Sequence, residues 1–437
     1  MNAPVQSGFF GHRVLAATFV LAVFGWGVGF YGPPVFLHAV VERTQWPVAM
    51  VSAAVTAHFV VGALVVANLP RLYRAWGTAR LTFAGAVLSA LGTCGWAWAQ
   101  APWQLFVASA LSGAGWVALG AAAVNALIAP WFVARRPWAL AMAYNGASVG
   151  GVIFSPLWVL LIGMLGFGGA SVLVGVVMVA CLAVLCKSVF SRTPERLGQA
   201  PDGLPESNSN PVSASNSSAA SATAATSTTR PPPPVLSWRA DRRFLTLAGA
   251  MALGLFAQIG LIAHLYSLLA PALGERVAGM AMGLATACAI LGRSLAGWLV
   301  PAGADRRLAA CASYALQVLG SMVLWVGAAG IGAAGAGATI AIWLGMALFG
   351  LGIGNATSLP PTIAQAEFVR ADAQRAVPLM VAIAQGGYAF APAVFGALRA
   401  LDEAAAPAML FGLAAILQAA AIASLLAGRR APAVVVS

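Results

Sequence analysis

One charged side chain lies deep inside an apolar stretch of this sequence: Arg293, within Ala289–Trp298. A guanidinium group stays protonated in proteins, so burial cannot neutralise it. If the stretch crosses a bilayer, the charge costs at least ~2.5 kcal/mol by insertion scales. No aspartate or glutamate falls inside the apolar stretches to compensate it. A fixed positive charge without a counter-ion predicts a site for an anion that binds and leaves.

Uncharged polar residues in the apolar stretches supply the other candidate contacts. Buried amides in lipid need partners, so each either bonds between helices or lines a cavity. An asparagine can bond a carboxylate, and it can also cap a helix that a proline breaks. The candidate substrate-binding residues are Arg293, Asn125, Asn355, Asn145, Gln385, Tyr388, Tyr31 and Gln258.

Two histidines, His58 and His264, are the titratable groups nearest physiological pH that lie well inside the apolar stretches. Either side chain can carry a proton across its pKa range, which makes both candidates for a proton relay. A neutral histidine bonded to a neighbouring helix is the alternative for each.

Composition excludes an ordinary soluble protein, because 61% of the 437 residues are hydrophobic and only 8% are charged. The five cysteines lie in apolar runs without metal spacing. We find no nucleotide-binding loop, nucleophile–base pair or redox motif. The sequence therefore predicts neither an enzyme nor a bound cofactor or metal.

Apolar runs long enough to cross ~30 Å of hydrocarbon recur along the chain. We predict an all-α membrane protein with twelve transmembrane helices, in two six-helix, pseudo-symmetric bundles. The predicted spans are 14–40, 46–68, 81–99, 103–128, 138–165, 169–189, 244–270, 278–300, 308–330, 337–359, 377–399 and 404–427.

The net charge of +12 follows the loops between these spans. When alternate loops are assigned to two sides, nineteen of the 23 lysines and arginines fall on one side and three on the other. This bias indicates orientation and not nucleic-acid binding. We expect a multi-pass protein of the cell membrane, the inner membrane in a bacterium, with both termini cytoplasmic.

A polar segment divides the spans into six plus six. Residues 207–229 are almost entirely Ser, Ala, Thr and Asn, and four prolines follow at 231–234. Such a composition cannot bury enough apolar surface to order itself. We predict an N-terminal bundle at 1–190, a cytoplasmic linker at 191–243 that is disordered in 201–235, and a C-terminal bundle at 244–437.

The two halves repeat a short pattern. Asn125–Pro130 and Asn355–Pro360 both read Asn-Ala-x-x-x-Pro at the end of the fourth span of their half. Asn145-Gly146 near the start of the fifth span corresponds to Gln385-Gly386 near the start of the eleventh. These matches favour an internal duplication about an axis normal to the membrane.

With this organisation the chain resembles the major facilitator superfamily. Within it, the sequence is most similar to the monocarboxylate transporter and oxalate–formate antiporter branch. The resemblance rests on Trp131–Met142 running into Gly146–Gly151, and on Gly292-Arg293 in the eighth span. It implies that Arg293 binds a substrate carboxylate and that two bundles rock around a central site.

The chain also departs from that branch. Ala289 stands where monocarboxylate transporters carry an aspartate, and the first span has no lysine. Gln385 and Tyr388 are the polar residues of the eleventh span, where the oxalate–formate antiporter has a lysine. One positive charge favours a monoanion over a dianion, and the usual proton-coupling acid is missing.

We therefore predict a secondary transporter for a small organic monoanion, most simply a monocarboxylate, with a coupling proton or a counter-anion as its partner. The expected state in the bilayer is a monomer. An exporter of hydrophobic or amphiphilic compounds and a non-transporting receptor or sensor are the alternatives.

The predicted orientation can be tested at the linker. A cysteine introduced by Ser215→Cys should not react with an impermeant thiol reagent added to intact cells, because the linker is expected in the cytoplasm. Labelling at the rate of an extracellular control cysteine would reverse the orientation.

Overall fold

The computed structural model describes residues 8–203, 241–301, 304–330 and 336–429. Within these ranges the chain is helical and contains no β-strand. Ten helical segments are long and apolar enough to cross a membrane. The all-α prediction is confirmed.

The helices follow one another along the chain with short connections. Those before the linker are α1 (Gly11–Gly29), α2 (Gly32–Thr44), α3 (Val48–Trp76), α4 (Thr78–Trp98), α5 (Pro102–Val117), α6 (Ala121–Ile128) and α7 (Arg136–Leu185), with a π-helical turn η1 (Cys186–Phe190). Those after it are α9 (Arg242–Leu273), α10 (Glu275–Leu299), α11 (Arg306–Ala329), α12 (Ala336–Ile353), α13 (Leu359–Glu367), α14 (Arg370–Tyr388), α15 (Ala391–Arg399) and α16 (Ala406–Ala427).

The structure has twelve crossings among its described residues, because one of the ten long segments crosses twice and the shorter helix α12 adds one more. The 55-residue stretch Arg136–Phe190 contains Gly166, whose φ of 68° and ψ of 167° reverse the chain between two crossings. The apolar part of α12, Gly337–Ile353, is shorter than the ten long segments. With α12 and both parts of α7, the twelve predicted spans are confirmed in number.

Several crossings are broken where the sequence has glycine or proline. The first crossing breaks at Phe30 and Tyr31, just before Pro33 and Pro34. The eleventh breaks between α14 and α15, just before Pro392. The tenth was predicted to run from 337 to 359 but α12 ends at Ile353, because a turn at 354–358 bends the backbone against α10.

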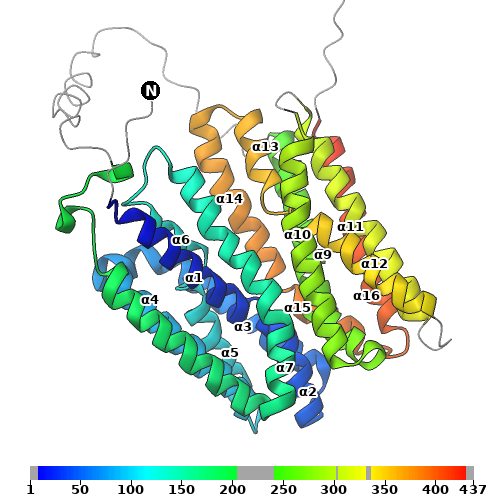
Figure 1. Cartoon of the computed structure of the whole chain (residues 1–437). Coiled ribbons are helices and arrows are strands. Elements are labelled where there is room, and N and C mark those ends of the chain that lie inside the picture. The colour runs from blue at the N-terminus through cyan, green and yellow to red at the C-terminus, as the bar shows by residue number, and fades with distance from the viewer. Residues whose placement is uncertain (1–7, 204–240, 302–303, 331–335, 430–437) are drawn as a thin grey trace, which may run out of the picture.

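Each half packs as its own bundle, α1 to α7 on one side and α9 to α16 on the other (Figure 1). In the first half α4 packs on α5 and α1 on α7; in the second, α11 packs on α12 and α16. We call the end where α1 begins and α16 ends the tail end, and the opposite one the far end. The halves meet mainly through α7–α10, α3–α15 and α2–α9, and they separate toward the tail end.

The segment after the sixth crossing packs onto the first half. Pro201–Gly203 forms a short 3₁₀ turn in which the Asp202 carboxylate accepts hydrogen bonds from the backbone N–H groups of Val133, Ala134 and Arg135. The predicted disorder at 201–235 therefore does not begin at 201, and its part from 204 onward lies outside the described residues. The domain boundaries at 190 and 243 stay a prediction.

A buried ion pair ties together four elements of the second half. Arg307 on α11 is 2% exposed and donates two hydrogen bonds to Glu367 at the end of α13, at 2.6 and 2.8 Å. Its guanidinium also donates to Thr246 on α9 and to the Leu425 carbonyl on α16. Every nitrogen of this cation thus has an acceptor.

Removing this arginine should destabilise the protein strongly. Arg307→Ala leaves Glu367 and the surrounding acceptors without a donor, so we expect a loss of about 3 kcal/mol. Arg429→Ala is the control, because its pair with Asp305 is 37% and 38% exposed and should contribute less than ~1 kcal/mol. Thermal unfolding of the two purified variants compares them, and equal losses would contradict the argument.

Candidate functional site

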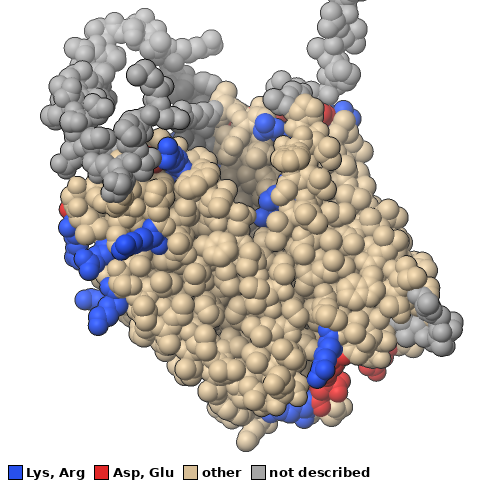
Figure 2. Space-filling view, in the orientation of Figure 1, with Lys and Arg blue, Asp and Glu red and all other residues tan. Residues whose placement is uncertain are grey.

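The two halves enclose a hollow at the tail end, visible in the space-filling view (Figure 2). The two halves are in contact through α7 and α10. A Cβ atom added to Gly151 would lie 2.5 Å from both Thr286 and Tyr31. One turn or more farther in, Pro156 packs against Gly283 and Val159 against Gly279. The residue order shows that these parts of α7 and α10 are antiparallel.

This register brings Asn145 and Arg293 to the same depth. Asn145 precedes Gly151 by roughly 9 Å of helix and Arg293 follows Thr286 by roughly 10 Å, at 1.5 Å per residue. Asn145 shares its helix face with Val152 and Pro156, which contact α10, yet it is exposed itself. The α7 face directed at α10 is therefore open at the level of Arg293.

Arg293 is partly buried and lacks a carboxylate partner in the described part of the chain. Its Nε donates to the Gly354 carbonyl at 3.0 Å, and its two terminal nitrogens have no hydrogen bond to a described residue. None of the three ion pairs among the described residues includes it. The terminal nitrogens of a guanidinium match the two oxygens of a carboxylate.

Asn355 braces the backbone that holds this arginine. It is 5% exposed, and its Nδ2 donates to the Gly292 carbonyl at 3.2 Å. Arg293 bonds Gly354 in return, so two reciprocal hydrogen bonds link α10 to the turn after α12. This geometry supports a positioning role for Asn355 beside Arg293.

Tyr31 connects the two halves at the contact between α7 and α10. It lies between α1 and α2, packs with Thr286 of α10 around Gly151 of α7, and interacts electrostatically with Arg293. Thr286 was not among the predicted residues. Its spacing could have identified it, since it precedes Arg293 by two helical turns and shares its face.

Asn125 is engaged within the first half. Its Nδ2 donates to the Ala121 carbonyl at 2.9 Å and to the Tyr144 hydroxyl at 2.7 Å. The edge of the Tyr144 ring packs on Trp26, with ring centroids 6.0 Å apart. These contacts brace α6 against α7 and α1, and the Asn125 side chain has no hydrogen bond to a described residue of the second half.

The remaining candidates lie in the second half, and none of them has a described hydrogen bond to Arg293. Tyr388 on α14 packs edge-on against Phe59 of α3, with centroids 6.1 Å apart. Gln385 is partly buried one turn before it, and its side chain has no hydrogen bond to a described residue. Gln258 on α9 is 7% exposed, and its buried Oε1 lacks a partner among the described residues. Their substrate contacts stay predictions.

Both histidines are buried at contacts between helices. His58 bonds Ser112 through Nδ1 and the Gly29 carbonyl through Nε2, both at 2.9 Å, so it links α3 to α5 and α1. His264 bonds the Pro392 carbonyl at 3.1 Å through Nε2, while its buried Nδ1 has no partner in the described ranges. The contacts favour bracing for His58, and a proton relay through either residue stays a prediction.

Sequence comparison decides the family. The profile of the Major Facilitator Superfamily matches residues 15–392, which is most of the chain. The chain belongs to the Major Facilitator Superfamily. No curated protein sequence shows significant similarity to it.

Solved structures show the same fold as this superfamily member. A POT family transporter in complex with a thioalcohol-conjugated peptide superimposes with a TM-score of 0.67 at 16% identity, covering 97% of this chain and 96% of that one. A mutant of the nucleoside transporter NupG gives 0.66 at 11% identity, with 95% and 98% covered. A bacterial homolog of the human lysosomal transporter Spinster, inward-facing and unoccupied, gives 0.63 at 14% identity, with 97% and 95% covered.

These findings show that this superfamily member is a multi-pass membrane transporter and not an enzyme, as predicted. The identities are too low to carry a substrate from any of these structures.

The tight contact at Gly151 predicts how the hollow responds to a larger side chain. In the present structure α7 and α10 are in contact. Gly151→Val should destabilise this arrangement by ~1 kcal/mol or more relative to one in which the contact is open, because the larger side chain overpacks Tyr31 and Thr286. A reporter cysteine introduced by Asn145→Cys, in a background without native cysteines, should then be alkylated about fivefold more slowly. Gly163→Val on the same helix is the control, since its Cβ meets no atom within 4 Å. Equal rates in both variants would refute the proposed register.

Proposed function

We propose that the protein moves a small organic monoanion, a monocarboxylate, across the membrane by alternating access around Arg293. The observation that carries the proposal is the cation itself: it is partly buried, bonded only through Nε, and without a carboxylate partner in the described ranges. A carboxylate on the two terminal nitrogens would complete its bonding and neutralise it.

The surroundings of Arg293 suit a singly charged ligand. Tyr31 and Asn145 lie within the same part of the molecule and offer a hydroxyl and an amide, which orient a ligand without adding charge. A dianion would need a second cation, and none of the described residues with which Arg293 interacts is one. Asn355 fixes the turn that positions the guanidinium.

The charge distribution supports cytoplasmic termini, with basic loops at the tail end. On that orientation the hollow opens to the cytoplasm and the far end is closed toward the outside. Import and export both remain compatible with one alternating site.

We also propose that anion exchange is at least as fast as net uptake. An anion on Arg293 shields a charge that the empty carrier would have to move through low dielectric unpaired, so reorientation is favoured when the site is occupied. The bonds that already engage His58, and the absence of acids from the apolar stretches predicted from the sequence, support exchange over proton symport.

Proteoliposomes test both proposals with labelled acetate, lactate and benzoate. We expect uptake to fall at least tenfold in Arg293→Lys, which keeps a charge but loses the planar fork, and to vanish in Arg293→Ala. Arg276→Ala, an exposed arginine in the first turn of the same helix, is the matched control and should transport normally.

Two results would count against the proposals. Full uptake in Arg293→Ala removes the anion site, and retained extrusion of a neutral amphiphile by that variant would favour the exporter. Much faster uptake into empty vesicles under an inward proton gradient than into preloaded ones contradicts exchange. Replacing His58 and His264 by glutamine then separates a histidine relay from protons carried by the substrate acid.

A further inference from the structure

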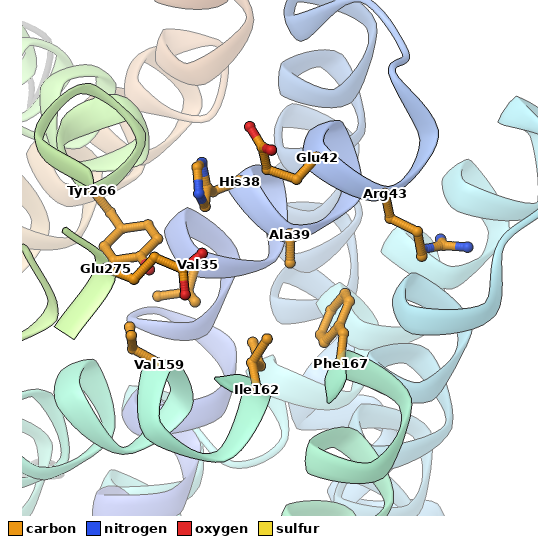
Figure 3. Close-up of a pocket in the computed structure, with 10 residues that line it drawn as sticks. All are labelled: Val35, His38, Ala39, Glu42, Arg43, Val159, Ile162, Phe167, Tyr266 and Glu275. Atoms are coloured by element: carbon orange, nitrogen blue, oxygen red, sulfur yellow. The ribbon is translucent and has the colours of Figure 1, made fainter. Parts of the chain in front are cut away.

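A second cavity lies at the far end, away from Arg293. It has a volume of about 330 Å³ and is formed by α2 and α7 from the first half and by α9 and α10 from the second. Figure 3 shows its lining. Because both halves contribute walls, any occupant of this cavity contacts both of them at the end where they are closed.

Two carboxylates without partners line the cavity from opposite halves. Glu42 comes from α2 and Glu275 from the first turn of α10. Both are exposed, and neither side chain has a hydrogen bond or ion pair with a described residue. His38 lies between them and interacts electrostatically with both.

The nearby cations are engaged elsewhere. Arg43 is directed away from Glu42 and donates to the carbonyls of Trp96 and Ala99, at 3.4 and 2.9 Å (Figure 3). Arg399 on α15 donates to Ser267 and is not part of the lining. Arg43 belongs to the lining, so the cavity carries two carboxylates against one guanidinium and presents a net negative charge.

The hydroxyl group of a buried tyrosine also faces the cavity, without a partner among the described residues. Tyr266 on α9 is only 2% exposed and belongs to the lining, yet its hydroxyl has no hydrogen bond to any described residue. The edge of the His38 ring packs against Tyr266, with ring centroids 5.1 Å apart. The Tyr266 hydroxyl is therefore available to a ligand in the cavity.

Apart from Arg43, the rest of the lining is apolar: Val35, Ala39, Val159, Ile162 and Phe167. A ligand that fits both parts carries one positive charge on a compact apolar body. A metal ion fits less well, since no group of three His, Cys, Asp or Glu able to hold one occurs among the described residues.

We propose that this cavity binds an organic monocation, a protonated amine with a small apolar body, whose ammonium group bridges Glu42 and Glu275 while Tyr266 accepts one of its hydrogen bonds. By joining the two halves, the bound cation stabilises the closed far end and opposes switching. The site is independent of the anion site, because it lies at the other end of the molecule and has the opposite charge.

Binding to the purified full-length protein tests the proposal without any transport assay, so its outcome is separate from that of the Arg293 experiments. The probe is benzylammonium, titrated by calorimetry, with benzyl alcohol as its neutral analogue. We expect saturable binding of benzylammonium at least tenfold tighter than that of benzyl alcohol. Glu42→Gln and Glu275→Gln should each weaken it about tenfold or more, and Tyr266→Phe should weaken it less.

Glu403→Gln is the matched control, an exposed carboxylate outside the cavity lining, and should bind like the unmodified protein. All of these positions except Tyr266 are exposed, so folding should be unaffected, and circular dichroism checks it. Undetectable binding to the folded protein, or equal binding in the three Glu→Gln variants, overturns the site. Dependence on only one of Glu42 and Glu275 overturns the bridge between the halves.

Discussion

The site around Arg293 depends on how closely α10 and α12 approach each other. A Cβ atom on Gly292 would run into the backbone at Leu351, and one on Gly354 would run into the backbone at Ala289. Only at this separation can Arg293 reach the Gly354 carbonyl while Asn355 reaches that of Gly292. Small residues allow such contacts where lipid provides no hydrophobic force between helices. The contact holds Arg293 in place.

Much of this arrangement could be predicted from the sequence, because it depends on features that are local. The spans follow from the length of apolar runs, and Arg293 is conspicuous in a stretch without other charges. The breaks of the first and eleventh crossings follow from Pro33, Pro34 and Pro392. The end of α12 could not be predicted, because residues 354–358 are apolar or neutral and leave the helix only to meet α10.

The pairing of residues across helices was also beyond the sequence. The spacing of Thr286 from Arg293 places it on the same helix face, but its contact with Tyr31 and Gly151 comes from the α7–α10 register, which the sequence does not give. Asn125 looked equivalent to Asn355 in the repeated pattern, but one bonds its own half and the other braces Arg293. Similar positions in the two repeats meet different neighbours, so the repeat fixes location and not role.

The broken crossings have a mechanical consequence. The 13 residues of α2 and the 9 residues of α15 are separated from α1 and α14 by breaks, and both pack on the opposite half, α2 on α9 and α15 on α3. A break interrupts the ladder of hydrogen bonds that would transmit a tilt along a continuous helix. Each of these two crossings is therefore built from two short rods, so α2 and α15 can change their tilt without carrying α1 and α14 with them.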